Sequence, residues 1–279
     1  MMILITSDEQ IRQNIPNVLA TVEGEPTLIE KLSPFIEQAE EWLAENFTST
    51  EILQAIATVQ DSTLKRLCVR VVIMEAFRAA VPSLDLVLTP NGFGIVSNQN
   101  IAPASKERVE RLMSSLEEIR DSVAENLLLH LSSLSEWQQT AQGNYFASTM
   151  FPFLNLCRRL AIREHIWDNY QNLHDRLIKI ENVLAETYFS QEQMRVFRSK
   201  VLNQSRNCHP LEEQVIRSIQ SYVLMLVSDM QVHTQSFYEL VNIIREHEDV
   251  FPAWHASDTA KLYSPAIFVN KKKAGGYWL

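Results

Sequence analysis

Apolar residues recur at three- and four-residue spacing along most of this chain, and this helical period constrains the fold more than any other feature. One such face follows Thr27 and Glu30, whose spacing is typical of a capping box that starts a helix. The stretch STLKRLCVRVVIMEAFRAA at 62–80 is apolar on nearly every side, which predicts a central buried helix. Only 6 of the 279 residues are Gly, which disfavours an α/β nucleotide enzyme with glycine-rich loops. We therefore expect a mainly α protein.

The helical period is interrupted once in the first half of the chain. Residues 84–97 (LDLVLTPNGFGIVS) carry β-favouring residues on both sides of the tight-turn sequence PNG at 90–92. They predict a small β-hairpin. Helical period then returns after Pro103 and continues to Trp137. Further helical segments are expected at 156–184, 191–203, 210–231 and 233–248.

Two segments in different halves of the chain resemble one another: AEEWLAENFTSTEIL at 39–53 and IENVLAETYFSQEQM at 180–194. This alignment pairs Leu43 with Leu184 and Ser49 with Ser190. It predicts an internal duplication, although two amphipathic helices can also match by chance. We expect two helical-bundle units, at 1–145 and 146–250.

Helical periodicity ends at Phe251, and residues 251–279 are predicted to form an extended C-terminal arm. Aromatic side chains near a chain end offset the entropy of ordering only if they dock. They pack either on the helices of the same chain or on a neighbouring subunit. The candidate interface residues are Asn91, Gly92 and Phe93 at the hairpin tip, and Tyr277 and Trp278 in the arm.

The formal net charge of −9 disfavours nucleic acid as a partner, because an acidic surface gains little from the release of phosphate counterions. The three cysteines lie far apart, which suits reduced thiols in the cytosol better than a disulfide framework. No apolar run reaches the roughly 18 residues of a membrane-spanning helix, and the apolar start of the chain is too short for a signal-peptide core. We expect a protein that is cytoplasmic at synthesis and has no membrane partner.

No sequence signature of catalysis or nucleotide binding occurs. None of the 7 histidines has a Glu three residues before it, so the Glu-x-x-His pairs of di-iron helical bundles are absent. Cys208 and His209 lack the second ligand pair of a tetrahedral zinc site. We therefore expect no catalytic residue, no cofactor and no bound metal.

The alternative is an enzyme or a small-ligand-binding helical protein with its site between long helices. The polar cluster that best suits such a site is His165, Asp168 and His174. About two and a half helical turns separate the two histidines, which favours a solvated charged face over a shared site. A host regulatory scaffold is a third possibility.

Four segments carry a resemblance to known proteins: ILITSDEQIRQNIPNV, LIEKLSPFIEQAEEWLAENF, SLDLVLTPNGFGIVSNQNIAPASKERVERL and the terminal FVNKKKAGGYWL. Together they resemble an uncharacterised family of Bacteroidales phage and prophage proteins encoded among virion-assembly genes. The helical openings are also similar to small all-α head–tail connector proteins, whose subunits form rings between portal and tail. The resemblance implies a prophage-encoded virion structural or assembly protein, in head completion or head–tail connection. It implies self-association or other virion proteins as partners, the virion as a final location, and no active-site residues.

Overall fold

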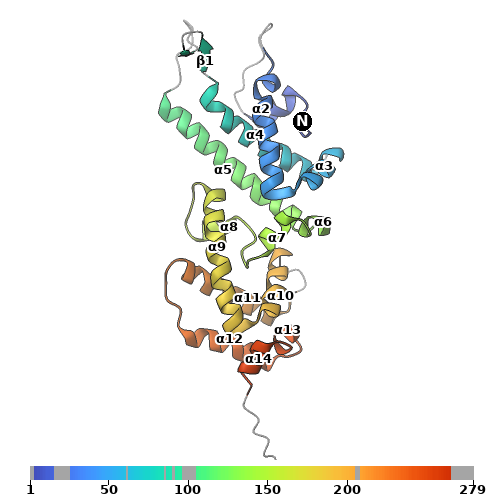
Figure 1. Ribbon diagram of the computed structural model, residues 1–279, viewed down its shortest axis with the longest axis vertical. Helices are drawn as coiled ribbons and strands as arrows, with labels where there is room; N and C mark the ends of the chain where they lie inside the picture. Colours follow the sequence, from blue (N-terminus) through green and yellow to red (C-terminus); the bar gives the residue numbers. More distant parts are fainter. Residues whose placement is uncertain are drawn as a thin grey trace, which may run out of the picture. The chain divides into compact units, whose positions relative to one another are not determined.

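The computed structural model describes residues 3–15, 26–60, 62–84, 86–89, 92–95, 105–204 and 208–264, with backbone alone for the two short segments 86–89 and 92–95. The described chain is mainly helical, as predicted (Figure 1). It divides into two compact units: Met1–Ile178 with Arg198–Arg206, and Lys179–Phe197 with Asn207–Leu279. None of the described helices is both long enough and apolar enough to cross a membrane.

The chain up to residue 159 contains eight α-helices among its described residues. Their order is α1 (Asp8–Asn14), α2 (Leu28–Leu43), the π-helical turn η1 (Ala44–Thr48), α3 (Thr50–Thr58), α4 (Thr63–Ala80), the 3-10 turn η2 (Val81–Ser83), α5 (Lys106–Leu131), α6 (Ser135–Gln138), α7 (Ala141–Ala147) and α8 (Asn155–Arg159). The predicted capping box is present, since Thr27 and Glu30 each accept the other's backbone N–H at the start of α2. The helix α4 contacts both α2 and α5 and is the central buried helix, as predicted.

The predicted hairpin is confirmed in the connection between α4 and α5. Its strands β1 (Leu86–Thr89) and β2 (Gly92–Ile95) pair antiparallel, with Leu86 opposite Ile95 and Thr89 opposite Gly92. In this register the two strands are joined by residues 90 and 91, which lie outside the described residues.

Beyond α8 the chain forms a second series of helices. They are α9 (Ile166–Leu184), the π-helical turn η3 (Ala185–Phe189), α10 (Gln191–Leu202), α11 (Pro210–Val227), α12 (Thr234–Glu246), α13 (Pro252–His255) and α14 (Asp258–Leu262). The expectation of an extended arm from residue 251 is wrong for α13 and α14. Phe251 and Trp254 are buried, so they belong to the core of the second unit. The rest of the arm, residues 265–279, lies outside the described residues.

Two predicted helices are interrupted. The helix expected to reach Trp137 ends at Leu131, and the extended backbone of Leu134 (φ −93°, ψ 117°) separates it from α6. Within α6, the Trp137 indole donates a hydrogen bond to a backbone carbonyl of η1. The helical stripe expected over 156–184 is split into α8 and α9. Ala161 and His165, between them, have φ values of 60° and 48°, which a right-handed helix does not allow.

The boundary expected at residue 145 does not coincide with the observed division. The aromatic ring of Phe47 in η1 lies 5.8 Å from that of Phe146 and 4.5 Å from that of Trp167 (ring centroids). Tyr170 continues the same cluster, 5.8 Å from Phe146. Residues after 145 therefore complete the core of the first unit, and the chain enters the second unit within α9.

The same order of elements occurs twice. We define repeat 1 as α2 to α7 and repeat 2 as α9 to α14. Each repeat has an α-helix, a π-helical turn, three further α-helices, a short helix and a final helix, in that order. In each repeat the final helix contacts the π-helical turn, α7 on η1 and α14 on η3.

The π-helical turns of the two repeats match in detail. Each ends at a buried serine with positive φ, 78° at Ser49 and 60° at Ser190. Each hydroxyl accepts the backbone N–H three residues further on, from Ile52 at 3.3 Å and from Gln193 at 3.1 Å. The serine thus caps the following helix in both repeats.

A tryptophan contacts each π-helical turn in the same way. Trp137 Nε1 donates to the Phe47 carbonyl at 2.6 Å, and Trp254 Nε1 donates to the Tyr188 carbonyl at 2.9 Å. Phe47 and Tyr188 are paired by the alignment that pairs Ser49 with Ser190. We call these two bonds the tryptophan–carbonyl bonds.

Three positions after each tryptophan, both repeats have a hydroxyl residue that makes the same hydrogen bond. Thr140 and Ser257 donate to the carbonyls of Trp137 and Trp254, at 2.7 and 2.6 Å, and each caps the helix that follows. A chance similarity of two amphipathic helices would not reproduce these bonds. We conclude that the chain contains an internal duplication.

Candidate functional site

A buried arginine connects three helices of the first unit. Arg120 on α5 has 4% of its side chain exposed and donates to Glu75 Oε2 on α4 at 2.7 Å. Its Nε and Nη2 atoms lie 2.9 and 2.8 Å from Asp121 Oδ1. The guanidinium also lies 5.0 Å from the ring centroid of Trp42 on α2, within cation–π range. A single side chain therefore joins α2, α4 and α5.

The charged groups around Arg120 shift one another's pKa values. Burial acts to raise the pKa of Glu75, but hydrogen bonds from Arg78 and Arg120 outweigh it and lower that pKa. Burial raises the pKa of Asp121 in spite of the Arg120 charge. The pKa of Arg120 is raised, since its neighbouring carboxylates outweigh the opposing effect of burial. Glu75 and Arg120 therefore both stay charged at neutral pH.

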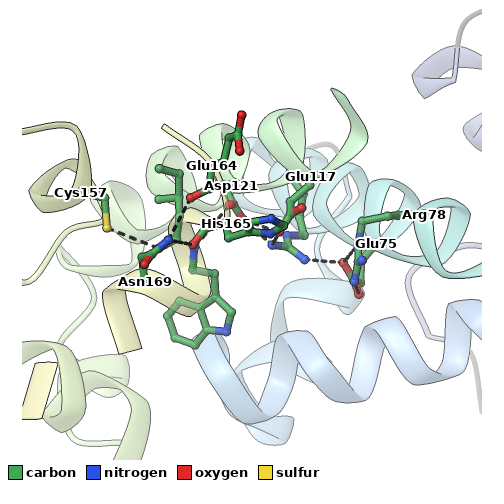
Figure 2. A network of polar contacts seen from close by, with 11 residues as sticks. Glu75, Arg78, Glu117, Asp121, Cys157, Glu164, His165 and Asn169 are labelled. Carbon is green, nitrogen blue, oxygen red and sulfur yellow. Dashed lines mark hydrogen bonds and ion pairs between the residues drawn. The ribbon is translucent and has the colours of Figure 1, made fainter. Parts of the chain in front are cut away.

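The same network reaches the start of α9. Asp121 Oδ2 accepts the backbone N–H of Trp167 at 3.4 Å, and Glu117 Oε1 lies 3.1 Å from His165 Nδ1. The Asn169 side chain donates to the carbonyls of Glu164 and His165, each at 3.0 Å, as Figure 2 shows. These bonds hold the segment that precedes α9 against α5.

A pocket of about 710 Å³ lies beside Asp121 in the first unit. Glu125, on its wall, accepts the backbone N–H groups of Leu154 and Asn155 at the start of α8, and burial raises its pKa. Its Oε2 atom is buried and has no hydrogen-bond partner among the described residues. The pocket carries both signs of charge, and its charged lining residues are Arg70, Glu118, Asp121, Glu125, Arg158 and Arg163.

The cluster His165, Asp168 and His174, named from the sequence, is only partly assembled. His165 and Asp168 lie together with Glu117, and both are exposed. His174 lies elsewhere in the first unit, 3% exposed, with its ring stacked 3.8 Å from that of Tyr145. The expectation of a solvated charged face is therefore wrong for His174.

His174 contacts a serine but is not arranged as a catalytic base. Its Nε2 atom lies 3.0 Å from the Tyr145 carbonyl and 3.0 Å from Ser148 Oγ. Since a carbonyl can only accept, Nε2 carries the proton, and the Ser148 hydroxyl itself donates to the same carbonyl. Burial lowers the pKa of His174, so the ring is neutral at pH 7. A general base would need an unprotonated nitrogen facing the serine hydroxyl.

The candidate interface residues lie mostly outside the described part of the chain. Gly92 and Phe93 are in β2, where the backbone alone is described. Asn91, Tyr277 and Trp278 are not described. Their role as contact residues stays a prediction.

The Arg120 network was not predicted, although the sequence contains a signal for it. Arg120 falls between Leu116 and Val123 on the apolar face of α5, where a charged residue needs a buried partner. Glu75 likewise interrupts the otherwise apolar run of α4. Charged residues on buried faces therefore predict a network, although they do not reveal which residues pair.

The model of a family of unknown function (DUF6712) matches residues 15–147, just under half of the chain. The match ends at the last residue of α7, which is the last residue of repeat 1. No curated protein and no solved structure matches the chain.

Proposed function

We propose that this protein is a prophage-encoded virion structural or assembly protein, in head completion or head–tail connection, and that it acts through protein–protein interfaces. The observation that carries the proposal is the difference between the two repeats in one connection. The equivalent helices are α4 and α5 in repeat 1, and α11 and α12 in repeat 2. Residues 81–105, with the hairpin, join the first pair, and residues 228–233 join the second.

The hairpin is therefore not required by the scaffold, because repeat 2 connects the corresponding helices without one. A hairpin of two strands is marginally stable in water when it stands alone. Each strand also has an outer edge whose backbone groups can pair with a strand of another chain. An added element of this kind is expected where a protein binds a partner.

The polar network supports a scaffold role. Glu75, Arg120 and Asp121 use their charges on one another and on the helices that they join. Buried charges that are paired in this way connect elements of structure and are not free to bind or protonate a substrate. Function through surfaces, including self-association or contact with other virion proteins, fits this use of the polar residues.

The test is to replace residues 81–105 by the sequence SDMQVH of residues 228–233, in the full chain and in the prophage. We expect a folded protein with nearly unchanged thermal stability, but loss of complete particles, measured by electron microscopy and infectivity. Phe93→Ala is the corresponding single substitution in the hairpin. Its control is Met230→Ala, because Met230 is an exposed residue of the short connection in repeat 2. Normal particles from a folded replacement variant would contradict the proposal.

The pocket beside Asp121 favours a second candidate function, the binding of a small ligand. The unpartnered Oε2 of Glu125 could accept a hydrogen bond from a ligand bound there. Native mass spectrometry of the protein purified from its host separates the two functions. A stoichiometric small molecule that is lost in Glu125→Gln, together with normal particles from the hairpin replacement, would favour the ligand binder.

A further inference from the structure

Three potential metal ligands from two parts of the chain meet at the surface of the first unit. Glu117, His165 and Asp168 each offer one ligand atom, and these three atoms lie within 4.8 Å of one another. Glu117 projects from α5, His165 precedes α9 and Asp168 lies in the first turn of α9. The closest pair, Glu117 Oε1 and His165 Nδ1, is 3.1 Å apart.

We propose that Glu117, His165 and Asp168 bind one divalent transition-metal ion, and that zinc is the best fit. One imidazole nitrogen and two carboxylate oxygens form a donor set that zinc uses in proteins, and water would complete the coordination. Metal–ligand bonds of about 2.1 Å place tetrahedral ligands about 3.4 Å apart. The Glu117 Oε1–His165 Nδ1 distance of 3.1 Å is close to that separation, and a bound ion would replace the proton that these two atoms share. Asp168 is exposed and therefore has the freedom to move inward.

The shape of the surface supports the proposal independently. A small hollow of about 30 Å³ is lined by Ser114, Glu117, Asp121 and His165, among others. A space of at least about 10–15 Å³ accommodates a water molecule. The hollow therefore has room for an ion or for one of its bound waters beside Glu117 and His165.

The electrostatics of the network also favour a cation. The carboxylates of Glu75, Glu117 and Asp121 outnumber the guanidiniums of Arg78 and Arg120. Glu117 is the carboxylate of this group that faces His165 at the exposed edge of the network. A cation bound at this edge would be attracted directly by that carboxylate.

Supporting contacts hold two of the ligands in position. Arg120 Nη2 lies 3.5 Å from Glu117 Oε1, and the Glu117 side chain is 14% exposed. Asn169 holds the backbone of His165 through its side-chain bond to the His165 carbonyl. Contacts of this kind keep metal ligands oriented. An ion bound here would tie the start of α9 to α5. Glu117 is distant in sequence from the other two residues, so ligand spacing in the sequence did not bring the three together.

The experiment is a calorimetric titration of the full chain, first stripped with a chelator, with zinc chloride. We expect one equivalent to bind and the thermal midpoint to rise with zinc concentration. His165→Ala and Asp168→Asn should each lower the zinc affinity at least about tenfold, since loss of a mere supporting contact already costs that much. The matched controls are His130→Ala and Asp249→Asn, which alter exposed residues outside the three-ligand cluster and should leave the affinity unchanged.

Three outcomes would overturn the proposal. One is the absence of saturable zinc binding. Another is zinc binding that is as tight in His165→Ala as in the unaltered protein, since other side chains would then hold the ion. A third is magnesium binding that competes with zinc and persists in His165→Ala, which would indicate a carboxylate cluster alone. The hairpin proposal is tested separately and does not depend on any of these results.

Discussion

Repeat 1 and repeat 2 share their internal contacts and differ in what is added to them. Both have the serine-capped π-helical turn and the tryptophan–carbonyl bond. Repeat 1 adds the hairpin, and its α5 has 26 residues where the equivalent α12 has 13. The buried residues of α12 are all apolar, whereas those of α5 include Arg120 and Asp121. The shared contacts define the scaffold, and the differences mark the places where the two repeats diverge.

The largest effect is expected from the two tryptophans. Trp137→Ala and Trp254→Ala should each destabilise the fold by about 3–5 kcal/mol, because each removes a fully buried ring and a hydrogen bond. Urea unfolding followed by circular dichroism measures both. If one substitution costs less than about 1 kcal/mol, well below the range for a buried tryptophan, the two residues are not equivalent. Trp137→Phe and Trp254→Phe keep a buried aromatic ring without the Nε1 donor, so they separate the hydrogen bond from the loss of the ring.

A smaller effect distinguishes the repeats at the helix after the tryptophan. A Cβ atom on Gly143 would lie 2.1 Å from the Trp137 carbonyl oxygen, so the backbone must shift in Gly143→Ala. We expect a loss of about 1–3 kcal/mol, as for other overpacked sites. Repeat 2 has Ala260 at the equivalent position, and Ala260→Gly should cost only about 0.5–1 kcal/mol. Thermal unfolding of both variants checks this asymmetry, and equal losses would contradict it.

The two serines test the similarity of the π-helical turns. Their φ and ψ values, 78° and 158° at Ser49 and 60° and 152° at Ser190, lie in a region that favours glycine. Alanine at either position should cost about 1–2 kcal/mol through loss of the cap. Glycine relieves the strained φ and should be more stable than alanine at both positions. A glycine variant less stable than its alanine counterpart, in either repeat, would show that the strain is absent.

The smallest expected effect is a dependence of folding stability on pH that comes from His174 on α9. The alignment pairs buried His174 with Ser33 on α2, so repeat 1 lacks this titrating group. Because burial lowers the His174 pKa from 6.5, the unfolded chain takes up a proton at higher pH than the folded chain. Stability is therefore complete above pH 6.5 and is lost as the pH falls toward the lowered pKa, by at most about 1.4 kcal/mol per pH unit.

His174→Gln should remove this part of the pH dependence. Chemical unfolding at several pH values between 5 and 7 measures it, and His130→Gln, which alters an exposed histidine, is the control. A slope that is unchanged in His174→Gln but reduced in His130→Gln would place the titrating group on α5 instead.

Local sequence predicted most of the elements because their signals are local. The capping box at Thr27, the buried helix α4 and the hairpin depend on side chains within a few residues of one another. The pairing of Ser49 with Ser190 was also visible, because duplicated segments keep similar residues at the same spacing. The phage assignment and the interface role of Phe93 remain proposals that rest on the sequence.

The sequence by itself determined the helical class, the hairpin and the trace of a duplication, since each follows from periodicity or from short-range spacing. Only the tertiary structure showed that Trp137 and Trp254 bond equivalent carbonyls and that Arg120 joins three helices. It also placed Glu117 beside His165 and separated His174 from both. These contacts join residues far apart in the chain. Packing of apolar faces decides which helices meet, and no local pattern states which polar side chains then come within hydrogen-bonding distance.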